Sequence, residues 1–256
     1  MSPDQTGKIA WDQFDAVLFD LDGVLTDTAR LHTEAWKRTF DEFLRRRAEA
    51  TGEPFRPFDP GADYLRYVDG RPRFDGVRDF LRSREIDLPE GPDEAVPGFD
   101  TVRAVGNQKN ELVNELFESR GVEAFPGSVA LVRQLRTAGL RTGVVTSSGN
   151  CEAVLAAAKI QDLFEVKVDA DLAARKQLAG KPAPDTFLEA ARALGSEPGR
   201  SVVVEDAISG VQAGRSGGFG LVIGVARKGN ADALRESGAD VVVSDLAELV
   251  GPEPRT

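Results

Sequence analysis

The chain has 256 residues, of which 41% are hydrophobic and 29% charged, so it can form one large or two smaller domains around a sizeable core. Its formal net charge of −10 argues against a nucleic acid or an anionic membrane as partner, because both select basic surfaces. The single cysteine, Cys151, excludes a disulfide within the chain and favours a cytoplasmic location. No apolar run reaches the roughly 18 residues of a membrane span, and the polar residues 1–10 predict no signal peptide.

The first element expected along the chain is a buried strand that ends in two acidic residues. Residues 16–20 form a short apolar run that ends at Asp20, and Asp22 and Gly23 follow it. Side chains alternate between the faces of a strand, so carboxylates two residues apart can share a side. They repel each other unless a cation lies between them or one binds a proton, and either arrangement suits chemistry. The alternative is a strand that simply ends in an Asp-Gly turn.

Residues 28–123 contain no run that favours a strand, and they are expected to be helical. One helical face is formed by Leu31, Ala35, Phe40, Phe43 and Leu44. A second helix is expected over residues 101–119, where apolar residues recur at helical spacing. Residues 51–61 and 88–98, which are rich in Pro and Gly, are expected to be loops. Arg73 is placed in a further polar loop because it follows Gly70 and Pro72.

After residue 125 the pattern changes to strands that alternate with helices. Strands are expected at residues 141–146, 165–168, 201–205, 220–225 and 240–243, and one of the helices at residues 184–194. Apolar strands that alternate with helices are typical of a parallel sheet covered on both faces. The strand at residues 16–20 finds partners only in this half, so the helical segment is an insertion into one α/β domain. Residues 251–256 are expected to be frayed.

Candidate functional residues occur at the ends of these strands, where parallel sheets bind their ligands. Carboxylates, a hydroxyl and an ammonium occur at four strand ends or helix starts: Asp20 and Asp22, Thr146, Lys181, and Glu205 and Asp206. Hard oxygen ligands gathered at one place suit Mg²⁺. A hydroxyl, backbone N–H groups and an ammonium suit a phosphate.

These residues, in this order, resemble the four motifs of the haloacid dehalogenase superfamily of phosphotransferases. Three further segments resemble its β-phosphoglucomutase-like branch: residues 26–29 with His32 and Trp36, residues 181–185, and residues 205–210. The resemblance covers the core well and the insertion at a few positions. It implies an α/β fold in which a Rossmann-like, doubly wound parallel sheet (residues 1–28 and 126–256) carries an inserted α-helical cap domain (residues 29–125).

The resemblance also implies a set of catalytic and metal-binding residues. Asp20 is expected to be the nucleophile that forms an aspartyl-phosphate, and Asp22 the general acid and base. Mg²⁺ is expected to be held by Asp20, the main-chain carbonyl of Asp22, and Asp206, with Glu205 as a supporting ligand. A carboxylate that attacks a phosphoryl group meets strong charge repulsion, and a metal ion and a lysine offset it.

The transferring phosphoryl group is expected to bind Thr146 and Lys181, and the Lys181–Pro182 peptide bond is expected to be cis. Further substrate contacts are expected from the loop that follows Thr146: Ser147, Ser148 and Asn150. In sugar mutases of this family a lysine often precedes the asparagine, whereas here that residue is Gly149. Both a mutase and a phosphatase are compatible with such a loop.

At the start of the insertion and within it, five residues are expected to contact the substrate: Thr28, His32, Trp36, Arg73 and Lys109. Arg73 and Lys109 are the candidates for a second, distal phosphate site. Alternatives remain open, because His32 can merely cap or pack on the first cap helix and Trp36 can belong to the cap core. Arg71 and Arg78 compete with Arg73 for the phosphate.

The activity implied is that of a Mg²⁺-dependent phosphotransferase on a hexose phosphate, in the manner of the conversion of β-glucose 1-phosphate to glucose 6-phosphate. A mutase must also exclude water while its bisphosphorylated intermediate reorients. The close alternative is a sugar-phosphate phosphatase, which transfers the same group to water. A non-enzymatic phospho-Asp signalling or binding module is more remote, because it needs neither Asp22 nor the large insertion. We expect a monomer whose partner is a small phosphorylated sugar.

Overall fold

The computed structural model describes residues 9–251. Residues 1–8 and 252–256, which include most of the segments expected to be a polar N-terminus and a frayed C-terminus, lie outside the described residues. The chain forms two compact units, one made of residues 9–27 and 123–251 and the other of residues 28–122. Within residues 9–251, no helix has the length and hydropathy that crossing a bilayer requires.

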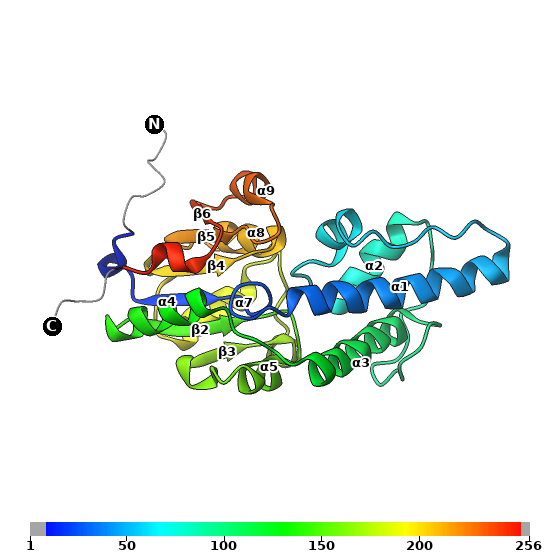
Figure 1. Cartoon of the computed structure of the whole chain (residues 1–256), viewed down its shortest axis with the longest axis horizontal. Helices are drawn as coiled ribbons and strands as arrows, with labels where there is room; N and C mark the ends of the chain where they lie inside the picture. Colours follow the sequence, from blue (N-terminus) through cyan, green and yellow to red (C-terminus); the bar gives the residue numbers. More distant parts are fainter. Residues whose placement is uncertain (1–8, 252–256) are drawn as a thin grey trace. The chain divides into compact units, whose positions relative to one another are not determined.

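The first unit is built on a six-stranded sheet in the order β3-β2-β1-β4-β5-β6 (Figure 1). Its strands are β1 (Ala16–Phe19), β2 (Arg141–Val145), β3 (Val166–Val168), β4 (Ser201–Glu205), β5 (Leu221–Val225) and β6 (Val241–Val243). All neighbouring pairs are parallel. Every residue of the two central strands, β1 and β4, is buried, as expected of a sheet covered on both faces. The predicted doubly wound α/β fold is therefore confirmed.

Helices and short 3₁₀ segments connect these strands. The helices are α4 (Pro126–Thr137), α5 (Cys151–Ala157), α6 (Ala170–Lys176), α7 (Asp185–Ala193), α8 (Ile208–Ser216) and α9 (Ala231–Glu236). The 3₁₀ segments are η1 (Trp11–Gln13), η3 (Gln161–Leu163), η4 (Pro198–Arg200) and η5 (Leu246–Leu249). Helix α7 packs on β1, β2 and β3 because Phe187, Ala190 and Ala191 form its buried face. Helix α8 packs on β4 and β5. The order of strands reverses between β1 and β4, which is where such sheets bind ligands.

The second unit is helical, and its described residues form no strand, as predicted. It consists of α1 (Ala29–Thr51), a π-helical turn η2 (Tyr64–Val68), α2 (Arg73–Ser83) and α3 (Val102–Arg120). Aromatic side chains fill its core: the ring centroids of Phe40 and Phe80 lie 4.1 Å apart, and Phe58 packs on both rings. Such packing contributes more than its buried area alone, because aromatic edges and faces attract each other.

The prediction of a loop around Arg73 is wrong, because Arg73 begins helix α2. Pro72 occupies the N-cap position with φ −53° and ψ 136°, the extended backbone that precedes the first turn of a helix. The helix then buries Val77, Phe80 and Leu81 at helical spacing. Gly70 and Pro72 are therefore as compatible with the start of a helix as with a loop.

Candidate active site

Strand β1 delivers Asp20 to the carboxyl edge of the sheet. The Asp20 N–H donates to the carbonyl of Val204 at 2.9 Å, so the pairing with β4 continues one residue past β1. The chain then turns at Gly23, whose φ of 92° is unfavourable for residues with a side chain. The N–H groups of Leu25 and Thr26 both donate to the Leu21 carbonyl at 3.0 Å and close the turn that carries Asp22.

Lys181 connects this edge to the start of α7 and is only 2% exposed. Its ammonium donates to Asp20 Oδ1 at 2.5 Å, to Glu205 Oε1 at 2.6 Å and to the Val145 carbonyl at 3.0 Å. A lysine ammonium has three N–H donors, and these three acceptors can use all of them. The Lys181–Pro182 bond is cis, which confirms the prediction.

Burial and the charges of neighbouring groups have opposing effects on the pKa of Asp20 and on that of Lys181. Burial raises the pKa of Asp20 well above its usual range, and Lys181 opposes this while Glu205 and the neighbouring aspartates reinforce it. For Lys181, burial lowers the pKa, but the attraction of Asp20 and Glu205 is stronger in total and the pKa is raised. Asp20 and Glu205 share the single charge of Lys181, and a further cation would relieve the repulsion between them.

Three of these carboxylates form a candidate metal centre. Asp20, Glu205 and Asp206 each offer an oxygen within 4.8 Å of the others, and all three residues are buried. Glu205 is held in place by its other oxygen, Oε2, which accepts the N–H groups of Asp206 and Ala207 at 2.9 Å each. A buried cluster of hard oxygen ligands with an excess of negative charge fits a divalent cation such as Mg²⁺.

Three contributors to this centre were not predicted from the sequence. Lys228 lies after β5 and pairs with Asp206 Oδ2 at 2.8 Å, and the Asn230 amide donates to the Asp206 carbonyl at 3.0 Å. Gly210 of α8 faces Glu205 so closely that a Cβ at this position would overlap the Glu205 carboxylate. Residues 226–230 follow a predicted strand, so the rule that strand ends carry function could have identified the first two.

Thr146 and the loop after it form the part of the site predicted for the phosphate. Thr146 follows β2, is 3% exposed, and places its hydroxyl 3.5 Å from Asp22 Oδ2. The same hydroxyl accepts the Ser148 N–H at 3.1 Å, and the Ser148 hydroxyl accepts the Asn150 N–H at 3.2 Å. Ser147 and Asn150 are half-buried in this loop. The structure thus brings together at one edge all six predicted core residues: Asp20, Asp22, Thr146, Lys181, Glu205 and Asp206.

In the helical unit, three of the predicted substrate-binding residues lie together. The Lys109 ammonium is 2.8 Å from His32 Nδ1 and 5.0 Å from the centroid of the Trp36 ring, and Lys109 is 4% exposed. His32 also packs on Phe117, with ring centroids 5.6 Å apart. Trp36 stacks on Phe40 in the core of the unit. Thr28 is fully buried at the N-cap position of α1.

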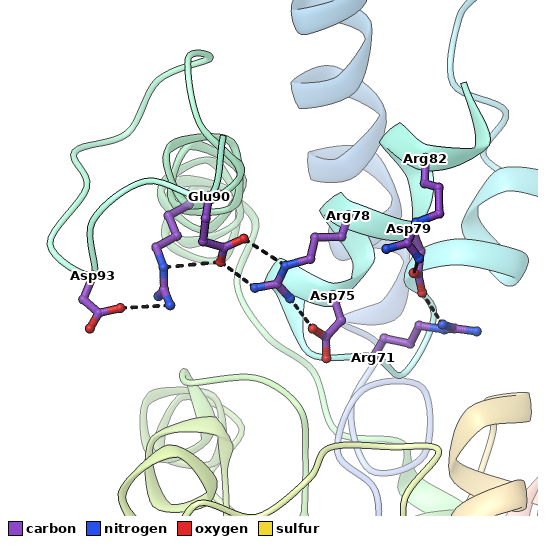
Figure 2. A network of polar contacts seen from close by, with 8 residues as sticks. Arg71, Asp75, Arg78, Asp79, Arg82, Glu90 and Asp93 are labelled. Carbon is purple, nitrogen blue, oxygen red and sulfur yellow. Dashed lines mark hydrogen bonds and ion pairs between the residues drawn. The ribbon is translucent and has the colours of Figure 1, made fainter. Parts of the chain in front are cut away.

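Arg73 donates from Nη2 to Asn107 Oδ1 at 3.0 Å. Figure 2 shows that its two competitors, Arg71 and Arg78, belong to a network of ion pairs on and around α2. Arg71 pairs with Asp79, and Arg78 binds Glu90 through both Nε and Nη2 and also pairs with Asp75. Arg71 and Arg78 are therefore each engaged by carboxylates.

The chain matches known proteins over most of its length. Residues 14–218 match the family model for haloacid dehalogenase-like hydrolases. A β-phosphoglucomutase of Mycobacterium bovis is 50% identical over 238 residues, which cover 92% of this chain and 91% of that protein. A validoxylamine A 7′-phosphate phosphatase of Streptomyces hygroscopicus subsp. limoneus is 29% identical over 93% of this chain and 97% of its own length.

A solved structure of a similar protein has the same fold. A β-phosphoglucomutase from Clostridium difficile superimposes with a TM-score of 0.70 at 25% sequence identity, over 92% of this chain and 93% of that one. The matched residues 14–218 include the helical insertion between β1 and β2. The chain therefore belongs to the haloacid dehalogenase-like hydrolase family of enzymes.

Proposed function

We propose that this enzyme is a Mg²⁺-dependent phosphotransferase that acts on a hexose phosphate and interconverts β-glucose 1-phosphate and glucose 6-phosphate. The observation that carries the proposal is the 50% identity, over nine-tenths of both chains, to a protein known as β-phosphoglucomutase. The core site agrees with it, because a buried carboxylate, Asp20, lies between a lysine and two further carboxylates.

In the proposed reaction, an oxygen of Asp20 attacks the phosphorus atom and the bond from phosphorus to the sugar oxygen breaks. Asp22 gives a proton to the departing oxygen. In the second step Asp22 takes a proton from the acceptor hydroxyl, which attacks the aspartyl-phosphate and frees Asp20. Such proton transfer accelerates a reaction by about 10²–10⁴-fold. Lys181 and Thr146 hold the phosphoryl oxygens throughout.

Mg²⁺ would be held by Asp20, Asp206 and the main-chain carbonyl of Asp22, with Glu205 in support, and it supplies charge that offsets the repulsion between carboxylate and phosphate. Lys228 and Asn230 orient Asp206 in this arrangement. Ligand carboxylates that are themselves held by hydrogen bonds bind metals better than mobile ones.

The helical residues 29–125 form, in this proposal, a cap that recognises the rest of the substrate. Arg73 and Lys109 bind the phosphate that is not being transferred, since a guanidinium can hold a phosphate through two N–H groups. Thr28, His32 and Trp36 contact the substrate or support these cations, and Ser147, Ser148 and Asn150 contact the transferring phosphate. We also propose that the enzyme is a monomer and that it acts in the cytoplasm, a location in keeping with its single cysteine.

A sugar-phosphate phosphatase is the second candidate, and one observation favours it. Gly149 occupies the loop position at which related sugar mutases often carry a lysine, so this loop offers one phosphate-binding cation fewer. The first half-reaction would be the same, and water would replace the sugar hydroxyl as acceptor.

One assay separates the two candidates. The full-length enzyme is incubated with Mg²⁺, β-glucose 1-phosphate and a trace of glucose 1,6-bisphosphate, while glucose 6-phosphate and free phosphate are followed together. A mutase accumulates glucose 6-phosphate and releases little phosphate. Release of one phosphate for each β-glucose 1-phosphate consumed would overturn the mutase proposal in favour of the phosphatase.

A further inference from the structure

Asn107 of α3 lies between Arg73 and the loop that leads into α3. Its Oδ1 accepts a hydrogen bond from Arg73 Nη2 at 3.0 Å, and its Nδ2 donates to the Ala95 carbonyl at 2.7 Å. The second bond crosses to residues 88–98, which form no helix or strand. One side chain thus connects the first residue of α2 to this loop.

The orientation of the Asn107 amide follows from its two partners. A guanidinium only donates hydrogen bonds and a carbonyl only accepts them. Turning the amide over would place its NH₂ group against Arg73 and its oxygen against the Ala95 carbonyl, and both contacts would be repulsive. The amide therefore has one stable orientation, in which it directs its oxygen at Arg73.

The loop that anchors Asn107 is itself held to α2 and α3 by charged contacts. Arg103 of α3 pairs with Asp93 at 2.9 Å and with Glu90 at 3.5 Å, and Glu90 also binds Arg78 of α2. Figure 2 shows Glu90, Asp93 and Arg78 in this network. The Val102 N–H donates to the Pro89 carbonyl at 2.9 Å, which adds a backbone bond. These contacts hold the loop that contains Ala95, whose carbonyl accepts the hydrogen bond that orients Asn107 towards Arg73.

The chemistry of the contact suits an arginine that must bind an anion. Asn107 is neutral, so its contact with Arg73 fixes the guanidinium without neutralising its charge. The Arg73 guanidinium also lies 4.7 Å from the centroid of the Phe74 ring, a contact that restricts its position and keeps its charge. An asparagine at position 107 thus orients Arg73 without adding a negative charge that would repel a phosphate.

We propose that Asn107 is a positioning residue that holds the Arg73 guanidinium, through the Ala95 anchor, ready for the non-transferring phosphate of the substrate. The inference rests on the proposed role of Arg73 and deepens it. A pre-oriented arginine loses less side-chain freedom when it binds, so removal of Asn107 weakens substrate binding more than it slows the chemical steps.

A double-mutant cycle on the full-length enzyme tests this inference. KM and kcat for β-glucose 1-phosphate are measured for Arg73→Ala, Asn107→Ala and the double variant, with Asn114→Ala as a matched control. Helix α3 contains three asparagines, Asn107, Asn110 and Asn114. Asn114 serves as the control because no side-chain hydrogen bond of Asn114 is found among the described residues. We expect Asn107→Ala to raise KM about tenfold, as loss of a hydrogen bond to a charged group does, and to change kcat less. It should add nothing on the Arg73→Ala background, and Asn114→Ala should match the unmodified enzyme.

Asn107→Asp provides a second variant of unchanged size. Its carboxylate faces the Ala95 carbonyl and competes with the phosphate for Arg73, so we expect KM to rise at least as far as in Asn107→Ala. Independent, multiplicative losses from Asn107→Ala and Arg73→Ala would overturn the inference. A rise in KM with Arg73→Ala but none with either Asn107 variant would overturn it while leaving the proposed function intact. No effect of Arg73→Ala would remove the distal role of Arg73 and this inference with it.

Discussion

At the scale of single residues, Asp20 and Asp22 owe their different proposed roles to different surroundings. Asp20 is buried against Lys181 and Glu205, and its oxygens are fixed for attack. Asp22 lies beyond the end of β1, in a turn closed by hydrogen bonds to the Leu21 carbonyl, with the Thr146 hydroxyl 3.5 Å away. A carboxylate in a turn can exchange protons with a substrate more readily than one held by a lysine.

Replacing each aspartate by asparagine should therefore have different consequences. Asp20→Asn should abolish turnover, because an amide cannot act as the attacking oxyanion. Asp22→Asn should lower kcat by about 10²–10⁴-fold through loss of the general acid and base. It should still bind Mg²⁺, because the proposed ligand is the main-chain carbonyl. The measurements are kcat and a Mg²⁺ titration of each variant, and full activity of Asp20→Asn would contradict the mechanism.

The close approach of Gly210 to Glu205 gives a second prediction at this scale. Gly210→Ala should displace the Glu205 carboxylate, because the added Cβ would overlap it. We expect about a 10–100-fold loss of Mg²⁺ affinity, as for other residues that orient metal ligands. Mg²⁺-dependent thermal stabilisation measures this directly. The control is Gly199→Ala, since a Cβ at Gly199 meets no atom within 4 Å; equal Mg²⁺ affinity of both variants would remove the supporting role of Glu205.

At the scale of elements, one glutamate connects helices α6 and α7. Glu189 of α7 accepts hydrogen bonds from Arg192 at 2.9 Å and from Lys176, in the last turn of α6, at 2.5 Å. These bonds, from Arg192 first, lower the pKa of Glu189 from 4.5 to about 2. Since the folded pKa lies below the unfolded value, the stabilisation is complete above pH 4.5 and is lost as the pH falls towards 2.

Glu189→Gln should accordingly reduce stability at pH 7, and the difference from the unmodified enzyme should shrink as the pH approaches 2. Urea unfolding midpoints at several pH values measure this. Glu197→Gln, which changes an exposed glutamate after α7, should give the curve of the unmodified enzyme. A deficit of Glu189→Gln that stays constant with pH would show that the charge of Glu189 contributes nothing.

The elements also show what the sequence can and cannot predict. All six strands lie within one residue of their predicted bounds, because each is a short, mostly apolar run between polar or turn-forming residues. The central strands β1 and β4 are buried throughout, whereas the edge strands β3 and β6 are partly buried. Helix α2 was missed because Gly70 and Pro72 before it resemble a loop, although its apolar side chains recur at helical spacing. The π-helical turn η2 was missed too, since its Tyr64 and Val68 are buried by packing on the helical unit, which no local pattern records.

At the scale of the whole molecule, the site follows from the order of strands. Asp20, Thr146 and Glu205 were predictable as neighbours because each follows or ends a strand of one parallel sheet. Lys228 also follows a predicted strand, but its pairing with Asp206 depends on β5 lying next to β4, and sequence pattern alone does not give that order. Likewise, Asn107 and Ala95 are 12 residues apart, and only the folded loop brings them together.

The net charge of the whole molecule indicates that substrate recognition depends on local cations. A chain with a net charge of −10 does not attract an anionic substrate through its overall field. Recognition of a sugar phosphate must come from a few local cations, of which Lys181 in the sheet unit and Arg73 and Lys109 in the helical unit are the candidates. In the proposed reaction a phosphoryl group passes through Asp20 to a sugar.

Transfer of a label tests that claim most directly. The enzyme is mixed with glucose 1,6-bisphosphate carrying radioactive phosphate, quenched, and digested, and a chase with unlabelled β-glucose 1-phosphate follows in a parallel sample. The account predicts label on the peptide that contains Asp20, none on the Asp20→Asn variant, and passage of the label into glucose phosphate during the chase. Label that remains on the Asp20→Asn protein, or that leaves the unmodified enzyme only as free phosphate, would contradict it.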